Sequence, residues 1–325
     1  MHPISNNCKH DLENASNPRP LPLPLPESGH EPVLLAETLE NLNPQPGKIM
    51  VDCTLGRGGH AAALAQRLGP DGLLLVLDAD PRNLDFARQR LAALPPGASP
   101  IRFFLANFAE LPDVIAAAGC GLVDGILADL GISTNQLFDE GYGMSFAQPM
   151  PLDMRIDPRT PTSAADIVNK WREDDLANVL YQLAQERYSR RIARKIVEAR
   201  RDSPITTTDR LAGLVRSAIP SRGGAPERID PATRTFLALR MVVNRELENL
   251  QSLLRLAPQH LKKGGRLAVI SFQSTEDRLV KQAFRSAEQT GLLKVLTKKP
   301  LSPPDDELAR NPRSRSAKLR AAERN

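Results

Sequence analysis

Residues 48–68 read KIMVDCTLGRGGHAAALAQRL, and this stretch decides the fold. Its beginning, residues 48–55, is apolar and typical of a buried strand, whereas residues 59–68 are rich in alanine and typical of a helix. Three glycines fall within four positions between these two elements. Glycine adopts positive φ without strain and lets a ligand come close to the backbone. The stretch therefore predicts the strand–turn–helix unit of an α/β fold.

Strands and helices continue to alternate on both sides of this unit. Further apolar strands are predicted at 72–80, 101–107, 124–131 and 264–272. Helices are predicted at 32–42, 81–94 and 233–261. Such alternation predicts a parallel sheet with crossover helices. Residues 132–225 break the pattern, because they are helical or irregular and contain no clear strand, so we expect a helical domain inserted into an α/β core.

The two ends of the chain differ in composition from the rest. Residues 17–29 alternate proline with leucine, which favours an extended polyproline II segment, so residues 1–29 are expected to form a disordered tail rather than a docking motif. Residues 310–325 contain six basic residues and one acidic residue, which equals the net charge of +5 of the whole chain. We expect residues 300–325 to form a basic tail, which is either an arm for nucleic acid or a solubilising, disordered terminus.

Composition excludes several classes of protein. The chain has 325 residues, of which 41% are hydrophobic and 25% charged, as in soluble globular proteins of one or two domains. No apolar run approaches the ~18–20 residues of a membrane span, and the N-terminus lacks the apolar region of a secretory signal. Cys8, Cys53 and Cys120 are far apart and fit no disulfide framework or zinc spacing. We therefore expect a cytoplasmic protein with no membrane contact and no metal site.

The acids near the glycine turn indicate what it binds. Asp78 ends the next predicted strand, 19 residues after Gly59, where a carboxylate can accept both hydroxyl groups of a ribose. The turn lacks the Gly-Lys-Ser/Thr sequence of a nucleoside triphosphate loop, so another nucleoside cofactor is expected. Asp52 lies within the first strand and would face a diphosphate poorly, but it would attract a cationic ammonium such as that of S-adenosylmethionine. NAD stays open, and so does the alternative that Asp52 only caps the end of its strand.

Six strings carry a resemblance to a known family: DCTLGRGGH, DGILADLGIS, PLDMRID, ERYSRRIARKIVEAR, PATRTFLALRMVVNREL and NPRSRSAKLR. They resemble the bacterial small-subunit ribosomal RNA methyltransferase H family, also called MraW, from about His30 to Arg324. The resemblance implies a Rossmann-like S-adenosylmethionine-dependent methyltransferase core at 30–131 and 226–299, with an inserted helical substrate-binding domain at 132–225. It also implies methylation of the N4 amine of a decoding-centre cytidine, cytosine 1402, in 16S rRNA.

The resemblance further assigns the cofactor-binding residues, which are Gly58, Gly59, His60, Asp78, Phe108, Asp129 and Gln136. Asp78 would hold the ribose, and Phe108 would flank the adenine. Asp129 and Gln136 would complete the pocket beside the methyl group. The residues themselves independently favour the glycine turn, Asp78 and Asp129, which is another acid at the carboxyl end of a strand. Taken alone, Phe108 is typical of a core aromatic, Gln136 of a surface loop and His60 of the first turn of a helix.

Methyl transfer to an amine requires the amine to be oriented within ~3–3.5 Å of the methyl carbon. A hydrogen-bond acceptor on the amine favours this, and Asp129 is the candidate catalytic residue, although its carboxylate would serve equally as a structural or cofactor contact. The base must leave its stack to enter a pocket. Phe138, Tyr142 and Phe146 are near the site in sequence and form either a stacking surface for the base or the core of the inserted domain.

Basic residues gather in two places that can meet RNA phosphates. Residues 186–201 contain seven basic residues and two acids, on a predicted helix with an apolar face. The predicted phosphate contacts, in this helix and in the basic tail, are Arg190, Arg191, Arg194, Arg313, Arg315, Lys318 and Arg320. A solvated basic face is the alternative for the helix. The expected partner is 16S rRNA in the small ribosomal subunit, and a homodimer stays open.

The chain departs from the family pattern beside the predicted active site. Gln273, in FQSTEDR, stands where the family has histidine. Ser133, Thr134 and Asn135 stand where it has paired serines and a proline, and EGYGMSF replaces RGFSF. Two other classes stay open: a non-catalytic RNA-binding relative that keeps the pocket, and an NAD-dependent oxidoreductase on a similar core.

Overall fold

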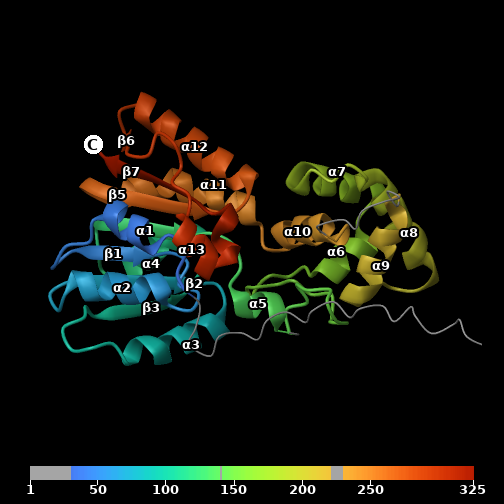
Figure 1. Cartoon of the computed structure of the whole chain (residues 1–325), viewed down its shortest axis with the longest axis horizontal. Helices are drawn as coiled ribbons and strands as arrows, with labels where there is room; N and C mark the ends of the chain where they lie inside the picture. Colours follow the sequence, from blue (N-terminus) through green and yellow to red (C-terminus); the bar gives the residue numbers. More distant parts are fainter. Residues whose placement is uncertain (1–30, 140, 221–229) are drawn as a thin grey trace, which may run out of the picture.

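The computed structural model describes residues 31–139, 141–220 and 230–325, which form two parts (Figure 1). An α/β core holds both ends of the described chain, and a smaller helical part is attached to one side of it. The proline-rich tail predicted at 1–29 lies outside the described residues. Across the described ranges, no helix is both long and apolar enough to cross a bilayer.

A sheet of seven strands forms the centre of the core, in the order β3-β2-β1-β4-β5-β7-β6. Its strands are β1 (Ile49–Asp52), β2 (Leu73–Asp78), β3 (Ile101–Leu105), β4 (Val123–Asp129), β5 (Leu261–Ser271), β6 (Leu293–Val295) and β7 (Lys318–Arg324). β1 to β5 are parallel to one another, whereas β7 is antiparallel to both of its neighbours. The strand order changes direction between β1 and β4, and α/β proteins bind ligands in the crevice at the carboxyl ends of such strands.

Helices cover both faces of the sheet, because successive residues of a strand point to opposite sides. Val51 and Leu77 pack against one set of helices, and Met50 and Val76 pack against the other. The first set is α4 (Leu111–Ala117), α11 (Glu246–Leu256) and α12 (Ser274–Gln289). The second set is α1 (Leu35–Leu42), α2 (Gly59–Leu68) and α3 (Pro81–Ala92). The predicted parallel sheet with crossover helices, the Rossmann-like α/β core, is confirmed.

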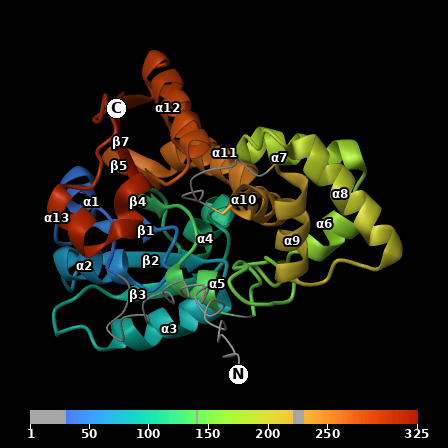
Figure 2. The same ribbon diagram turned by 45° about the vertical axis from the view of Figure 1, so that its right-hand side comes forward.

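The helical part has a hydrophobic core of its own. Its main helices are α6 (Ala164–Lys170), α7 (Glu173–Ala184), α8 (Ser189–Asp202), α9 (Thr208–Ala218) and α10 (Ala232–Val243). The short α5 (Thr134–Phe138) lies between this part and the core, as Figure 2 shows from a second direction. The apolar residues of α8 that face inward, Ile192 and Ile196, are buried in this second core, so the amphipathic pattern predicted a real packing face.

The boundary predicted at residue 226 differs from the packing. Phe236, Leu239 and Val243 of α10 are buried in the core of the helical part, so this helix belongs there and not to the α/β core. The single helical stretch predicted at 233–261 is also interrupted, because Arg245 has φ 48° and separates α10 from α11. Both differences have one cause: the apolar spacing of a helix does not reveal which of two cores it faces.

The basic tail predicted at 300–325 is not a separate arm. Residues 305–310 form α13 (Asp305–Arg310), the short helix η3 (Pro312–Ser316) follows, and β7 then inserts between β5 and β6. Leu319, Ala321 and Ala322 of β7 are fully buried. The prediction of a basic tail was wrong for this strand. The strand forms by pairing with segments that lie elsewhere in the sequence, and the high charge of KLRAAER gives no sign that its leucine and alanines are buried.

Candidate cofactor and substrate site

The turn after β1 has the geometry that its glycines predict. Gly56 has φ 50° and Gly58 has φ 79°, in the left-handed region that favours glycine. The backbone N–H of Gly56 donates to Oδ2 of Asp78 at 2.7 Å, which ties the turn to the carboxyl end of β2. A Cβ on Gly59 would lie 3.1 Å from Pro32, so larger residues would crowd this position. Gly58 faces α3, where an added Cβ would meet side-chain atoms at 3.4 Å.

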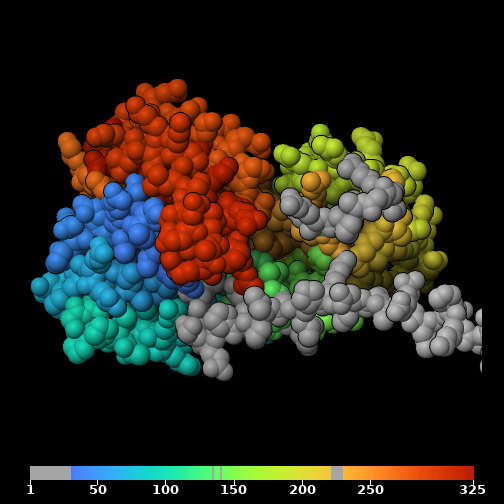
Figure 3. Space-filling view, in the orientation of Figure 1, coloured from blue at the N-terminus to red at the C-terminus, as the bar shows by residue number. Residues whose placement is uncertain are grey.

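A cavity of about 1080 Å³ opens at the carboxyl ends of the strands and reaches the helical part. The predicted cofactor residues that line it are Gly59, His60, Asp78, Phe108, Asp129 and Gln136. Gly58 lies outside the lining and shapes the turn instead. One half of the cavity is formed by the loops after β1 to β4, and we call it the cofactor half because the predicted cofactor residues lie there. The other half is formed by residues from 144–146 and 154–161, α10 and the junction of α10 with α11, and we call it the substrate half. Figure 3 shows the two parts of the molecule side by side, with the helical part in yellow-green.

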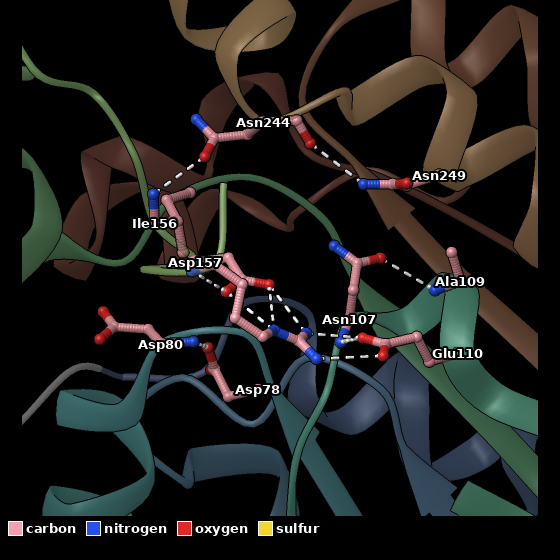
Figure 4. A network of polar contacts seen from close by, with 10 residues as sticks. Asp78, Asp80, Asn107, Ala109, Glu110, Ile156, Asp157, Asn244 and Asn249 are labelled. Carbon is pink, nitrogen blue, oxygen red and sulfur yellow. Dashed lines mark hydrogen bonds and ion pairs between the residues drawn. The ribbon is translucent and has the colours of Figure 1, made fainter. Parts of the chain in front are cut away.

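Two predicted contacts to an adenosine lie on the loops after β2 and β3. The Asp78 carboxylate accepts hydrogen bonds from the backbone N–H of Asp80 at 2.9 Å and from Nδ2 of Asn83 at 3.3 Å, in addition to the glycine turn. Phe108 begins the short helix η1 (Phe108–Glu110), which Asn107 caps by accepting the N–H of Ala109 at 2.9 Å (Figure 4). The sequence therefore places an acid and an aromatic ring on neighbouring loops with fixed backbones.

Glu110 joins this adenine-side turn to the substrate half of the cavity (Figure 4). Its Oε2 accepts the backbone N–H of Asn107 at 2.7 Å. Arg159 reaches across from the segment before α6 and donates to both Glu110 oxygens, at 3.1 and 2.7 Å, and to Asp157. The hydrogen bond to Arg159 is the main reason that the pKa of Glu110 is lowered. Sequence reasoning missed this link, because its partners are far apart in the chain.

Asp129 ends β4 and faces the cavity. Its backbone N–H donates to Oγ1 of Thr54 at 2.6 Å, which fixes the end of β4 to the glycine turn. Oδ2 lies 3.6 Å from Nδ1 of His60, whose Nε2 is 3.0 Å from the carbonyl oxygen of Val33. Oδ1 is buried and has no hydrogen-bond partner within the described part of the chain. The side chain as a whole is 20% exposed, so Asp129 reaches the cavity while Oδ1 itself is shielded from it.

The acids around the cofactor half are held in an unfavourable environment for negative charge. Burial raises the pKa of Asp52 to about 7, more than the hydrogen bond from the Thr54 N–H lowers it, and the Asp78 charge adds to the rise. Burial likewise raises the pKa of Asp78 to about 6, against the hydrogen bonds that it accepts. Burial, with the Asp52 charge beside it, raises the pKa of Asp129 well above its usual range. Such a site favours a ligand that brings positive charge.

Gln136 lines the cavity, but its polar atoms already bind the protein. Its Nε2 donates to Oδ2 of Asp80 at 2.7 Å, and its Oε1 accepts the backbone N–H of Ser133 at 3.0 Å. The hydroxyl of Tyr142 donates to the same Asp80 oxygen at 2.6 Å. Asp80, the second acid of the sequence DAD, is therefore the residue that joins α5 to the core, and sequence reasoning assigned it no role.

The three aromatics singled out in the sequence have different positions. Phe138 and Phe146 line the cavity, whereas Tyr142 is buried outside it. Phe146 packs edge-on against Phe236 of α10, with ring centroids 4.7 Å apart. Arg313 lies over the Phe138 ring, 5.2 Å from its centroid. The substrate half thus has an apolar wall with a cation at its edge.

The predicted phosphate contacts fall into three groups. Arg190, Arg191 and Arg194 lie on α8 and outside the cavity lining. The helix α8 itself lies on the side of the helical part away from the sheet (Figures 1 and 2). Arg313 and Arg315 are exposed on η3, and Arg313 lines the cavity. Lys318 and Arg320 lie on β7, where both approach Asp277.

Arg320 was wrongly predicted as a phosphate contact. It is only 6% exposed. Its guanidinium donates to both oxygens of Asp277, at 2.7 and 3.3 Å, so it holds β7 to the first turn of α12. A buried, paired arginine of this kind is a structural residue, because its removal would leave the carboxylate of Asp277 partly buried without a partner.

The fold and the site together define a class of protein. A Rossmann-like sheet, a glycine turn after β1, an acid at the end of β2 and a set of acids that favour a cation fit S-adenosylmethionine, which carries a sulfonium and an ammonium. The orphaned oxygens of Asp52 and Asp129 fit the same cofactor. No cluster of three or more metal-binding side chains occurs in the described ranges. The protein is an S-adenosylmethionine-dependent methyltransferase.

The sequence places it in a particular family. The profile of the MraW methylase family matches residues 27–325, and the chain belongs to this family. The predicted resemblance, the Rossmann-like methyltransferase fold and the cofactor are thereby confirmed, and the alternative of NAD is excluded.

Several relatives are similar over almost their whole length. The ribosomal RNA small subunit methyltransferase H of Acidobacterium capsulatum is 48% identical, over 91% of this chain and 98% of that protein. The proteins of the same name from Geobacter sulfurreducens and Koribacter versatilis are each 45% identical, over 91% and 97% of this chain and 98% and 99% of those proteins. A solved rRNA methylase from Streptococcus thermophilus aligns with a TM-score of 0.40 and 11% identity, over 89% of this chain and 93% of that one, which is too distant a likeness to add to the family match.

Proposed function

We propose that the protein transfers a methyl group from S-adenosylmethionine to the N4 amine of a cytidine in 16S rRNA, cytosine 1402 of the decoding centre. The observation that carries the proposal is the single cavity that joins the cofactor half to the substrate half, in a chain whose relatives are named as small-subunit rRNA methyltransferases. At about 1080 Å³ the cavity is at the upper end of the range for small-molecule sites, so it has room for a nucleotide beside the cofactor.

S-Adenosylmethionine supplies an electrophilic methyl group on a sulfonium. The glycine turn and Asp78 hold the ribose, and Phe108 flanks the adenine. Asp129 lines the same cavity with its side chain 20% exposed, and its carboxyl accepts a hydrogen bond from the N4 amine. This contact orients the amine toward the methyl group, and orientation of two reactants can supply a large part of a rate enhancement. His60, whose Nδ1 lies 3.6 Å from Oδ2 of Asp129, helps to hold the carboxyl in position.

The substrate half suits an unstacked base. The edge-on pair of Phe146 and Phe236 gives an apolar wall, and Arg313 and Arg315 of η3 supply cations beside it for phosphates. We further propose that the arginines of α8 contact the RNA away from the target nucleotide. The substrate is the small ribosomal subunit, which the protein meets in the cytoplasm.

Gln273 does not argue for an inactive relative. It precedes α12 and lines the cavity, and the Glu276 carboxylate accepts its backbone N–H at 2.9 Å and that of Phe272 at 3.0 Å. The residue is thus held by its backbone at the start of a helix. A methylated N4 amine is cationic and acidic, so water can take its proton, and the reaction needs no histidine at this position.

Small ribosomal subunits from a bacterial strain that lacks its own methyltransferase H test the proposal. After incubation with the protein and S-adenosylmethionine, mass spectrometry of the 16S rRNA should show one methyl group at N4 of cytosine 1402. Asp129→Ala is the paired variant and should bind the cofactor but transfer the methyl group at least tenfold more slowly. A methyl group on another nucleotide would refute the proposed position, and a wild type that binds but transfers nothing would favour the non-catalytic alternative.

A further inference from the structure

The wall of the substrate half contains one arginine whose side chain the fold does not use. Arg245 lies between α10 and α11, lines the cavity and is exposed. Its guanidinium makes no hydrogen bond, ion pair or ring contact with any residue in the described ranges. Two other arginines of the same wall are paired: Arg240 donates to Glu246 at 2.7 and 3.0 Å, and Arg159 binds Glu110 and Asp157.

The backbone of Arg245 is held in an unfavourable conformation. Its φ of 48° and ψ of 42° lie in the left-handed region of the backbone, which residues other than glycine rarely adopt. Both neighbours are clamped. Oδ1 of Asn244 accepts the N–H of Ile156 at 2.9 Å (Figure 4). Nδ2 of Asn244 donates to the carbonyl of Met154 at 2.8 Å. The side chain of Glu246 is held by two hydrogen bonds from the guanidinium of Arg240. Strain that the surroundings enforce in this way is typical of functional positions.

We propose that Arg245 binds a phosphate of the nucleotide whose base enters the cavity. An unstacked base stays attached to its ribose and to the two flanking phosphates, which must follow it to the cavity mouth. A guanidinium can bind two oxygens of one phosphate at once, and an unpaired arginine at the wall meets this need with no partner to displace. Arg57 and Arg313 also line the cavity, and each lies over an aromatic ring, so Arg245 differs from them in having no such partner, and Arg313 keeps its proposed phosphate contact beside it. The inference rests on the proposed function only in taking the ligand to be a nucleotide.

The first test uses kinetics on small ribosomal subunits. Arg245→Gly should raise KM for the subunit about tenfold, change kcat less than twofold and leave the S-adenosylmethionine Kd unchanged. The slope of log kcat/KM against log salt should fall by about one, since one phosphate contact is lost. Glycine accepts positive φ, so this variant should melt no lower than the wild type, and weaker RNA binding cannot then be attributed to unfolding.

Arg255→Ala is the matched control, because Arg255 is exposed on α11, the helix that follows Arg245, carries the same charge and lies outside the cavity lining. This variant should keep the wild-type KM and lower the salt slope by much less than Arg245→Gly does. If the two variants behave alike, Arg245 contributes only general positive charge, and the inference is wrong.

A second measurement separates this inference from the proposed function. With S-adenosylhomocysteine bound, calorimetry or NMR titration compares each of the four nucleosides with its 5′- and 3′-monophosphates. The wild type should bind one of the monophosphates about tenfold more tightly than the nucleoside, and Arg245→Gly should lose this preference. A wild type that binds nucleosides and monophosphates equally would overturn the role of Arg245 and leave the methylation proposal intact. A phosphate preference with a base other than cytosine would refute the proposed substrate and support Arg245.

Discussion

Replacing Asp52 by asparagine removes a buried charge next to the cofactor half of the cavity. Asp52 is 1% exposed, its Oδ1 accepts the N–H of Thr54 at 3.1 Å, and its Oδ2 has no hydrogen-bond partner among the described residues. Its pKa is about 7 in the folded protein and 3.8 ordinarily. Between these values the folded state holds a proton that the unfolded state has lost. The wild type therefore becomes less stable as pH rises from about 4 to about 7.

The size of this effect follows from the two pKa values. The difference between about 7 and 3.8 is roughly three units, or about 4 kcal/mol in the free energy of unfolding once the pH exceeds the higher value. At pH 5 the carboxyl in the folded state is still protonated, and only about 1.5–2 kcal/mol is lost. Between pH 5 and pH 8 the wild type should thus lose roughly 2–3 kcal/mol that the Asp52→Asn variant keeps.

Urea unfolding of the cofactor-free proteins at pH 5 and pH 8 measures this difference. The new amide N–H₂ lacks a partner, which costs about 1–3 kcal/mol, but this cost is the same at both pH values. The variant should therefore gain roughly 2–3 kcal/mol on the wild type from pH 5 to pH 8, whatever their absolute order. A gap that stays constant would show that Asp52 is already ionised at pH 5, and would remove the electrostatic reason for a cation-binding site.

Asp124→Asn is the control, because the pKa of Asp124 is lowered whereas that of Asp52 is raised. Burial alone would raise the pKa of Asp124, but the hydrogen bond from the N–H of Ile49 and the ammonium groups of Lys262 and Lys48 outweigh it and lower the pKa. Asp124 is therefore ionised in both states at pH 5 and at pH 8. Its replacement should destabilise the protein by the same amount at both values.

Three further predictions concern the cofactor and the RNA. Asp78→Ala removes the proposed ribose acceptor and should weaken S-adenosylmethionine binding by about 1.5–3 kcal/mol in calorimetry, and an unchanged affinity in a folded variant would take Asp78 out of the ribose site. Replacing both Arg313 and Arg315 by alanine should lower the slope of log K against log salt for RNA binding by about two, and the wild-type slope would show that η3 touches no phosphate. Gln273→His should change the single-turnover rate by less than about tenfold, or ~1.4 kcal/mol, and an inactive wild type that this change restores would support the non-catalytic relative.

The parts of the fold that the sequence predicted are those determined locally. The strand, turn and helix at 48–68 follow one another without interruption, so apolar spacing and glycine were sufficient to define them. The same is true of β2 with Asp78 at its end, which placed an acid beside the turn. Because parallel strands share one edge for their carboxyl ends, local patterns also predicted that these residues would meet.

The parts that the sequence did not predict depend on distant partners. β7 is a strand because β5 and β6 pair with it, and α10 leaves the α/β core because Phe236 and Leu239 fit the other hydrophobic core. Arg320 was assigned to RNA by its charge, whereas Asp277, 43 residues away, binds it. Charge and amphipathic spacing show that a residue needs a partner or a core, but not which one.

Asp52 shows why the charge of the cofactor could be inferred before its contacts. The sequence left two interpretations of this residue, a cap for the end of its strand and an attraction for a cation. The hydrogen bond from the N–H of Thr54 to Oδ1 supports the cap. Oδ2 has no hydrogen-bond partner in the described ranges, and the attraction for a cation stays a prediction. Asp52 lies outside the cavity lining, so it acts on a ligand through its field and not by contact. The same carboxyl therefore lowers the stability of the free protein above neutral pH and favours a cationic ligand, and a cofactor that binds only the folded state restores part of that stability.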